Sequence, residues 1–94
     1  MPEKDFSAFY SEVKKAATGS DKLRLVESLM NSNINLSVNQ VIALLKLFDF
    51  SSDKKKFFTL IKGHIADPQN IYKIYNHLDF SSDKDEARKV LEGK

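Results

Sequence analysis

The sequence predicts an all-α fold of six helices, arranged as three stacked helix-turn-helix units in a short α-α superhelix. The hexapeptide Asp-Phe-Ser-Ser-Asp-Lys occurs at 49–54 and again at 79–84, and a weaker copy, Thr-Gly-Ser-Asp-Lys, occurs at 18–22. These copies lie 32 and 30 residues apart, a period typical of stacked helix pairs. Between the copies, apolar residues recur at positions i, i+3 and i+4, which is the period of a helix with one buried face.

The first two helices are expected on either side of the weak copy. The apolar stripe of the first helix consists of Phe6, Phe9, Tyr10, Val13, Ala16 and Ala17. Gly19 is expected to end this helix, because glycine adopts the left-handed conformation at little cost. Ser20 or Asp21 can then cap the second helix. The apolar face of that helix consists of Leu23, Val26, Leu29 and Met30, and Asn31-Ser32-Asn33 ends it.

The third and fourth helices form the second expected unit. Ser37 and Gln40 have the spacing of a capping box, in which each side chain bonds the other residue's backbone N–H. The residues that follow are mostly apolar: Val38, Val41, Ile42, Leu44, Leu45, Leu47 and Phe48. The third helix is therefore expected to be the buried centre of the fold. The fourth helix begins at the first hexapeptide and turns inward Phe57, Phe58, Ile61 and Ile65.

The last two helices begin at Asp67-Pro68 and at the second hexapeptide. Aspartate can cap a helix, and proline suits the first helical position, where its missing N–H is no loss. The inward stripe of the fifth helix consists of Ile71, Ile74, Tyr75 and Leu78, and that of the sixth consists of Ala87, Val90 and Leu91. The three units then span about 6–32, 37–64 and 67–92 within a single all-helical domain, 1–94.

The hexapeptide itself is interpreted as a structural turn motif. Phe50 and Phe80 are expected to anchor the turn in the core. Ser51 and Ser81, each followed by a second serine, are expected to cap the next helix. Asp53 and Asp83 are expected in the first helical turn, where a carboxylate meets the positive end of the helix dipole.

Calcium binding is the alternative reading of the same motif. Asp49, Ser51 and Asp53 imitate ligand positions 1, 3 and 5 of an EF-hand loop. Such a loop also requires a glycine at position 6 and a bidentate glutamate at position 12, and this chain has Lys54 and Leu60 there. The second copy fails in the same way, so the sequence predicts no metal site.

No pattern in the chain indicates an enzyme or a cofactor. The chain has no cysteine, and its two histidines, His64 and His77, have no second ligand at metal-binding spacing. Neither a nucleophile elbow nor a glycine-rich phosphate loop is present. The charged and apolar fractions, 30% and 41%, are those of an ordinary soluble globular chain. Without a signal peptide or transmembrane run, the cytoplasm is the default expectation for its location.

Two groups of residues are candidates for binding. Lys54, Lys55, Lys56 and Lys62 could contact phosphates or an anionic membrane, although Asp53 adjoins them and a solvated helix face explains them as well. Tyr72 and Lys73 lie at the edge of the fifth helix's apolar stripe, where stacked helix pairs can form a binding groove or simply pack.

The expected function is a non-catalytic protein-protein interaction module that holds a peptide or helix of another protein. A peripheral adaptor for an anionic membrane or nucleic acid is the alternative, with nucleic acid disfavoured because the net charge is only +2.

Several of these segments together resemble the domain-of-unknown-function family numbered 4476. The segments are 36–41, 44–48 and 50–54, followed by Asp67 and Asn70. The segment 20–23 matches the first copy of that family's motif, but Thr18-Gly19 stands where an aromatic residue and aspartate are commoner. The resemblance extends from about Phe6 to Leu91. It implies a helical fold with no assigned activity, so no catalytic or binding residue can be transferred from it.

Overall fold

The computed structural model describes residues 1–93 and contains six α-helices and one short 3₁₀ helix in this range. In chain order the elements are α1 (Glu3–Lys15), α2 (Gly19–Met30), α3 (Val38–Leu45), α4 (Ser51–Ile61), η1 (Pro68–Asn70), α5 (Tyr72–Tyr75) and α6 (Ser81–Glu92). Within residues 1–93 the one β-type pairing is an isolated parallel bridge between Leu36 and Ile65. The predicted all-α class is therefore confirmed.

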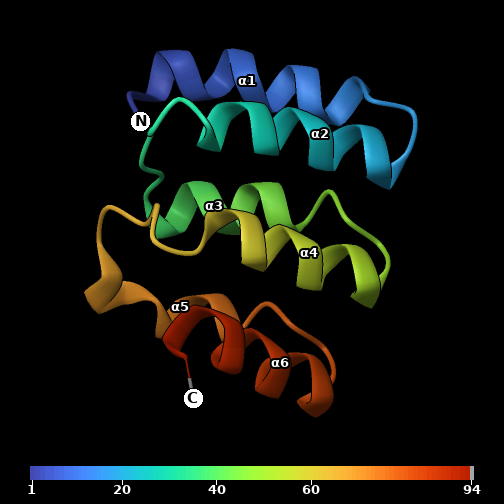
Figure 1. Ribbon diagram of the computed structural model, residues 1–94, viewed down its shortest axis with the longest axis vertical. Coiled ribbons are helices and arrows are strands. Elements are labelled where there is room, and N and C mark those ends of the chain that lie inside the picture. The colour runs from blue at the N-terminus through green and yellow to red at the C-terminus, as the bar shows by residue number, and fades with distance from the viewer. Residues whose placement is uncertain (94) are drawn as a thin grey trace.

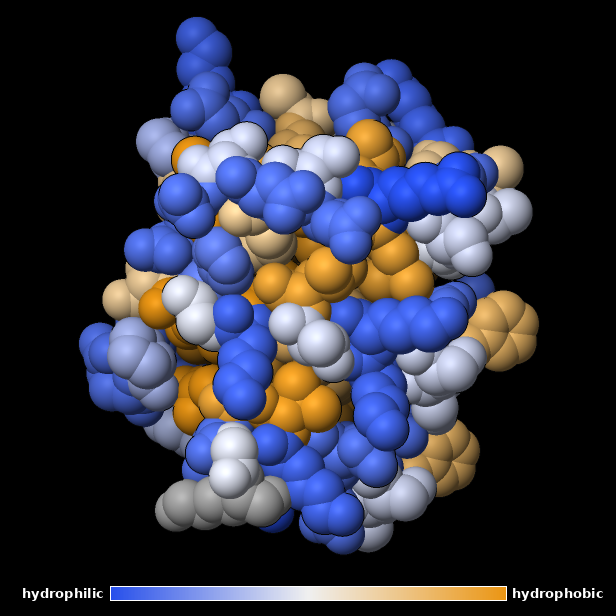
Figure 2. Space-filling model, viewed as in Figure 1, coloured by the Kyte–Doolittle hydropathy of each residue, from blue (hydrophilic) through white to orange (hydrophobic). Residues whose placement is uncertain are grey.

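The helices lie in two layers. Helices α1, α3 and α5 contact one another in succession, and so do α2, α4 and α6. Consecutive helices also pack as pairs, α1 with α2, α3 with α4 and α5 with α6. In Figure 1 the three pairs lie one below another, and α2, α4 and α6 all begin at the right-hand edge. Hydrophilic side chains cover much of the face formed by the α2 layer, with apolar surface exposed between them (Figure 2).

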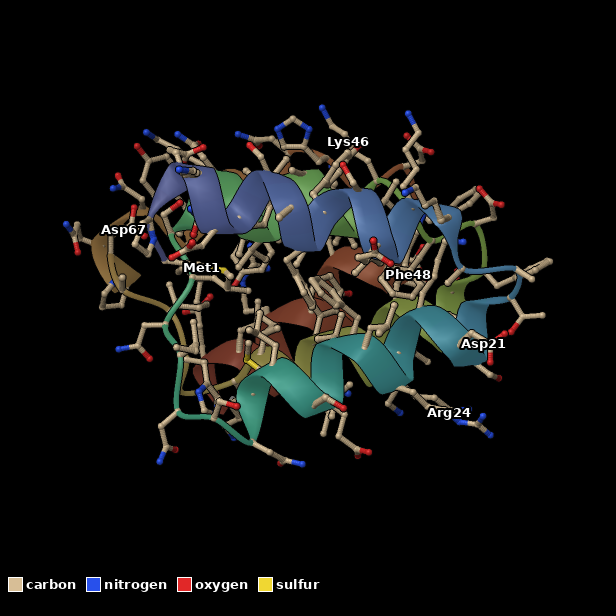
Figure 3. The ribbon with its side chains drawn as sticks, turned by 90° about the horizontal axis from the view of Figure 1, so that it is seen from above. Met1, Asp21, Arg24, Lys46, Phe48 and Asp67 are labelled. Atoms are coloured by element: carbon tan, nitrogen blue, oxygen red, sulfur yellow. The ribbon has the colours of Figure 1, made fainter. Side chains whose placement is uncertain are left out.

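Helix α3 is the most deeply buried helix of the described chain, as its sequence predicts. Its buried residues are Val38, Gln40, Val41, Ile42, Leu44 and Leu45. Phe48 follows the helix and packs on Phe57 of α4, with ring centroids 5.3 Å apart. Figure 3 shows Phe48 pointing between the two layers and Lys46 pointing away from them. The predicted capping box is present, because Gln40 N–H donates to the Ser37 hydroxyl and Ser37 N–H donates to the Gln40 side chain.

The boundary between α1 and α2 differs from the prediction. Helix α1 ends at Lys15, and Ala16 is extended. Gly19 does not adopt a left-handed conformation; it is the first residue of α2. The cap of α2 is Thr18, whose hydroxyl accepts a hydrogen bond from Asp21 N–H at 3.1 Å. Neither Ser20 nor Asp21 is therefore the cap, because both already lie inside the helix, which begins at Gly19.

The connection after α4 also departs from the expected helices. Helix α4 stops at Ile61, and Gly63 adopts a left-handed conformation with φ +80°. Ile65 therefore lies outside the helix, in the segment that pairs with Leu36 through two backbone hydrogen bonds of 2.7 and 2.8 Å. The expected fifth helix is reduced to one 3₁₀ turn and four α-helical residues. Its stripe still faces the core, with Ile74, Tyr75 and Leu78 buried.

Candidate interaction groove

A groove of about 710 Å³ lies between α2 and α4. Its lining is largely apolar, and the residues that form it are Ser20, Leu23, Arg24, Glu27, Ser52, Lys55, Lys56, Thr59 and Leu60. Leu23 and Leu60 are partly buried and pack against the core, so they form an apolar floor. Figure 2 shows apolar surface between α2 and α4, flanked by hydrophilic side chains. We call this feature the α2–α4 groove.

The walls of the α2–α4 groove come from equivalent positions of two copies of the motif. Ser20 and Arg24 of α2 correspond, 32 residues on, to Ser52 and Lys56 of α4. On each helix the lining residues follow an i, i+3, i+4, i+7 pattern, which places them on one face. The two helices begin at the same edge of the molecule and run in the same direction (Figure 1).

Basic side chains dominate the rim of the α2–α4 groove. Arg24 is 3.7 Å from Asp21, and Lys55 is 3.6 Å from Glu86, both as exposed ion pairs. Figure 3 shows Arg24 extending outward from α2. Exposed pairs of this kind contribute about 0–1 kcal/mol each. These cations can therefore exchange their present carboxylates for those of a ligand at little cost.

The four candidate lysines do not form one cluster. Lys55 and Lys56 line the α2–α4 groove, and Lys54 lines a smaller hollow between α4 and α6, which Lys55 also borders. Lys62 is exposed at the C-terminal end of α4, away from both linings. Neighbouring residues on a helix point about 100° apart, so a run of three lysines reaches different faces.

Tyr72 and Lys73 lie in the other layer and do not line the α2–α4 groove. Both are exposed, Tyr72 to 56% of its surface. Sequence reasoning placed the binding edge at these two residues, and missed Leu23 and Thr59 of the groove. The i+3, i+4 spacing of Ser20, Leu23 and Arg24 was the available signal.

The role expected of the phenylalanines and serines in the turn motif was wrong. Phe50 and Phe80 are 70% and 65% exposed, so they do not anchor the turn in the core. Each occupies the N-cap position in an extended conformation, and no side chain caps α4 or α6. Ser51 and Ser81 are already the first helical residues, one position too late to cap.

Asp53 and Asp83 do lie in first helical turns, and each also contacts the preceding helix pair. Asp83 Oδ2 accepts a hydrogen bond from the Ser51 hydroxyl at 3.0 Å. At the equivalent position of the earlier copy, the Asp53 carboxylate lies where a side chain on Gly19 would have to be. The motif therefore joins successive pairs through the first residue of α2 and of α4.

Asp67 makes a similar connection at the opposite edge. Its Oδ1 accepts a hydrogen bond from Val38 N–H at 2.7 Å, and its Oδ2 accepts one from the Asn70 side chain at 3.0 Å. Desolvation opposes ionisation of Asp67, but these hydrogen bonds outweigh it and hold the pKa of Asp67 below its ordinary value. Asp67 thus adds a second acceptor at the start of α3, beside the Ser37 cap, and its side chain makes no cap bond to its own segment.

A cluster of Tyr75, Arg88 and Glu92 connects α6 to α5. The Tyr75 hydroxyl donates a hydrogen bond to Glu92, and the Arg88 guanidinium lies 4.9 Å from the centre of the Tyr75 ring. Burial, reinforced by the hydrogen bond to Glu92, raises the pKa of Tyr75 well above its ordinary value. Tyr75 and Glu92 are 17 residues apart, so sequence periodicity gave no sign of this contact.

One family model, described as "Domain of unknown function (DUF4476)", matches residues 1–91. The chain belongs to this family. The comparisons with curated proteins and with solved structures found no significant match. The family description names no activity, so the groove's geometry supplies the basis for a functional proposal.

Two further findings concern what this family member's described residues contain. No group of three or more histidine, cysteine or acidic side chains in residues 1–93 is arranged to hold a metal ion. No helix in the same range is both long and apolar enough to cross a membrane.

Proposed function

We propose that the chain is a non-catalytic helical-repeat module that binds a peptide or helix of another protein in the α2–α4 groove. The observation that carries this proposal is the partly buried apolar floor of Leu23 and Leu60 at the surface between two helices. When a partner covers apolar surface that the folded chain leaves accessible, the free energy of the system falls, which favours binding.

The repetition of the motif supports the same proposal. Stacked helix pairs place equivalent side chains in a row, and such rows form the extended binding surfaces of helical-repeat proteins. Here the rows are Ser20 with Ser52 and Arg24 with Lys56. The polar groups in the lining are hydroxyls and charged side chains on a wide, open surface, an arrangement suited to contact with a partner.

The alternative is a peripheral adaptor for an anionic membrane or nucleic acid. That function requires several cations on one face. Of the four candidate lysines only Lys55 and Lys56 line the α2–α4 groove, and Lys55 already neighbours Glu86. The apolar floor favours a protein ligand over a polyanion.

A photo-crosslinking residue at Thr59 tests the proposal in cells that produce the family member naturally. Thr59 lines the α2–α4 groove and is exposed, and Ser7 on α1 provides a matched exposed position outside it. We expect a protein crosslinked from Thr59 and not from Ser7, and we expect the Leu23→Arg variant to abolish it. Equal crosslinking from both positions, or none from Thr59, would contradict the proposal.

A further inference from the structure

We infer that the ligand of the α2–α4 groove is an acidic amphipathic helix of a partner protein, oriented with its acidic end towards residues 20–24 and 52–56. This inference rests on the proposed function and specifies the class of partner. It follows from the length of the groove, from the hydrogen bonding of the backbone groups in its walls and from its charge distribution.

The dimensions of the groove fit a short helix. The lining runs from Ser20 to Glu27 on α2 and from Ser52 to Leu60 on α4, so the walls are roughly 11–12 Å long at 1.5 Å per residue. A ligand helix of about eight residues makes two turns over that length. Its apolar residues at i, i+3, i+4 and i+7 would rest on the floor of Leu23 and Leu60.

The walls favour a helix over an extended peptide. Both are α-helices, and between their first and last turns their backbone N–H and C=O groups are already bonded within the helix. An extended ligand lying on the apolar floor would find no backbone partners there, and unpaired buried backbone groups are costly. A helical ligand satisfies its own backbone and presents only side chains to the groove.

The charges of the lining select acidic residues on the ligand. Three cations line the groove, Arg24 from one wall with Lys55 and Lys56 from the other, and Glu27 is the single carboxylate in the lining. Asp21 and Glu86 neighbour Arg24 and Lys55, but only as exposed ion pairs. A ligand with carboxylates on both sides of its apolar stripe can therefore meet a cation on each wall.

The same charges give the ligand a direction. Arg24 and Lys56 are each the sixth residue of their helices and Lys55 is the fifth of α4, whereas Glu27 lies further along α2. The N-termini of α2 and α4 are at this same edge of the molecule, and their helix dipoles add positive potential there (Figure 1). The acidic end of the ligand is accordingly placed over the first two turns, and its less acidic end is placed near Glu27.

The test uses the full chain and two sets of labelled helical peptides, each about 12 residues long. The sets share one leucine stripe, flanked by glutamate in one set and by lysine in the other. Binding is measured by fluorescence anisotropy at low and physiological salt. We expect the glutamate-flanked set to bind at least tenfold more tightly, with the preference reduced by salt.

Charge-swapped variants locate the effect. R24E/K56E places carboxylates on both walls without breaking the Lys55–Glu86 pair, and should reverse the preference. K4E/K14E makes the same change of charge on α1, outside the groove, and should leave it intact. Thermal melting of both variants checks that the fold is retained.

The outcomes separate the two proposals. If Thr59 crosslinks to a protein but the peptide sets bind equally or not at all, the acidic-helix inference is overturned and the interaction function stands. If K4E/K14E acts like R24E/K56E, recognition is not in the groove and the inference fails. Tight binding to vesicles rich in phosphatidylserine or to an RNA oligonucleotide, lost in R24E/K56E, would overturn both proposals.

Discussion

Replacing Asp67 with alanine should destabilise the fold by about 2 kcal/mol, although Asp67 lies in a surface connection. The variant removes the acceptor of Val38 N–H, a 2.7 Å bond at the start of α3, and Val38 is only 1% exposed. A buried N–H left without a partner costs about 1–3 kcal/mol, and loss of a cap alone costs about 0.5–2 kcal/mol. For a domain of this size, 2 kcal/mol corresponds to a fall in melting temperature of roughly 8–16 °C.

Two further variants divide the effect of Asp67 into its parts. D67N keeps an acceptor oxygen but loses the charge, so it should cost about half as much as D67A. N70A removes only the 3.0 Å bond between the two side chains and should cost about 0.5 kcal/mol. Urea denaturation followed by circular dichroism measures all three. A loss of less than about 0.5 kcal/mol in D67A would refute the importance given to Asp67 as the acceptor of Val38 N–H.

The pH dependence of the same residue gives an independent check. Because the pKa of Asp67 is lowered in the folded state, ionised Asp67 stabilises the fold above its unfolded value, near 3.8. That contribution is lost as the pH falls through the folded pKa. The difference in stability between the native chain and D67N should therefore be constant above about pH 5 and should shrink at lower pH. A gap that does not change with pH would contradict the role given to the charge.

Three other predictions follow from contacts described above. Gly19→Ala should destabilise the native chain by about 0.5–1 kcal/mol, because the new methyl group collides with the Asp53 carboxylate. In a D53A background, where that carboxylate is gone, the same substitution should stabilise the fold by a similar amount. Urea denaturation of the double-mutant cycle measures the coupling between the two positions. F50S and F80S should each change the free energy of unfolding by less than about 0.5 kcal/mol, since both rings are exposed, whereas a core anchor would cost about 3–5 kcal/mol. The raised pKa of Tyr75 means that stability is present below about pH 10 and is lost as pH rises towards the folded pKa, and Y75F should abolish this alkaline loss in denaturation experiments.

Periodicity carried the sequence-based prediction of the helices. The apolar stripe of α3 and the capping box of Ser37 and Gln40 are local patterns, and both are present in the structure. The end of α4 was harder to predict, because the segment that follows it pairs with the distant Leu36. Ile65 fits the helical spacing of α4 but pairs with Leu36 instead, because tertiary packing outweighs local propensity at this position.

The site was predicted less well than the fold. A run of lysines attracts attention in a sequence, but the helix places Lys54 and Lys56 in different hollows, with Lys55 bordering both. The α2–α4 groove draws on two helices whose relative placement no single periodic segment reveals. Phe50 was misassigned because hydrophobicity alone suggests burial, whereas the extended N-cap position holds its ring in solvent.

The cross-pair contacts of Asp67 and Asp83 bear on how the chain acquires its structure during synthesis. The carboxylate that satisfies Val38 N–H is made 29 residues after it, and the one that meets the Ser51 hydroxyl is made 32 residues after it. In both cases the donor at the start of the earlier helix has no such acceptor until the ribosome has synthesised the later aspartate. Growth of the nascent chain should thus stabilise the stack retroactively, each new pair completing the one already outside the exit tunnel.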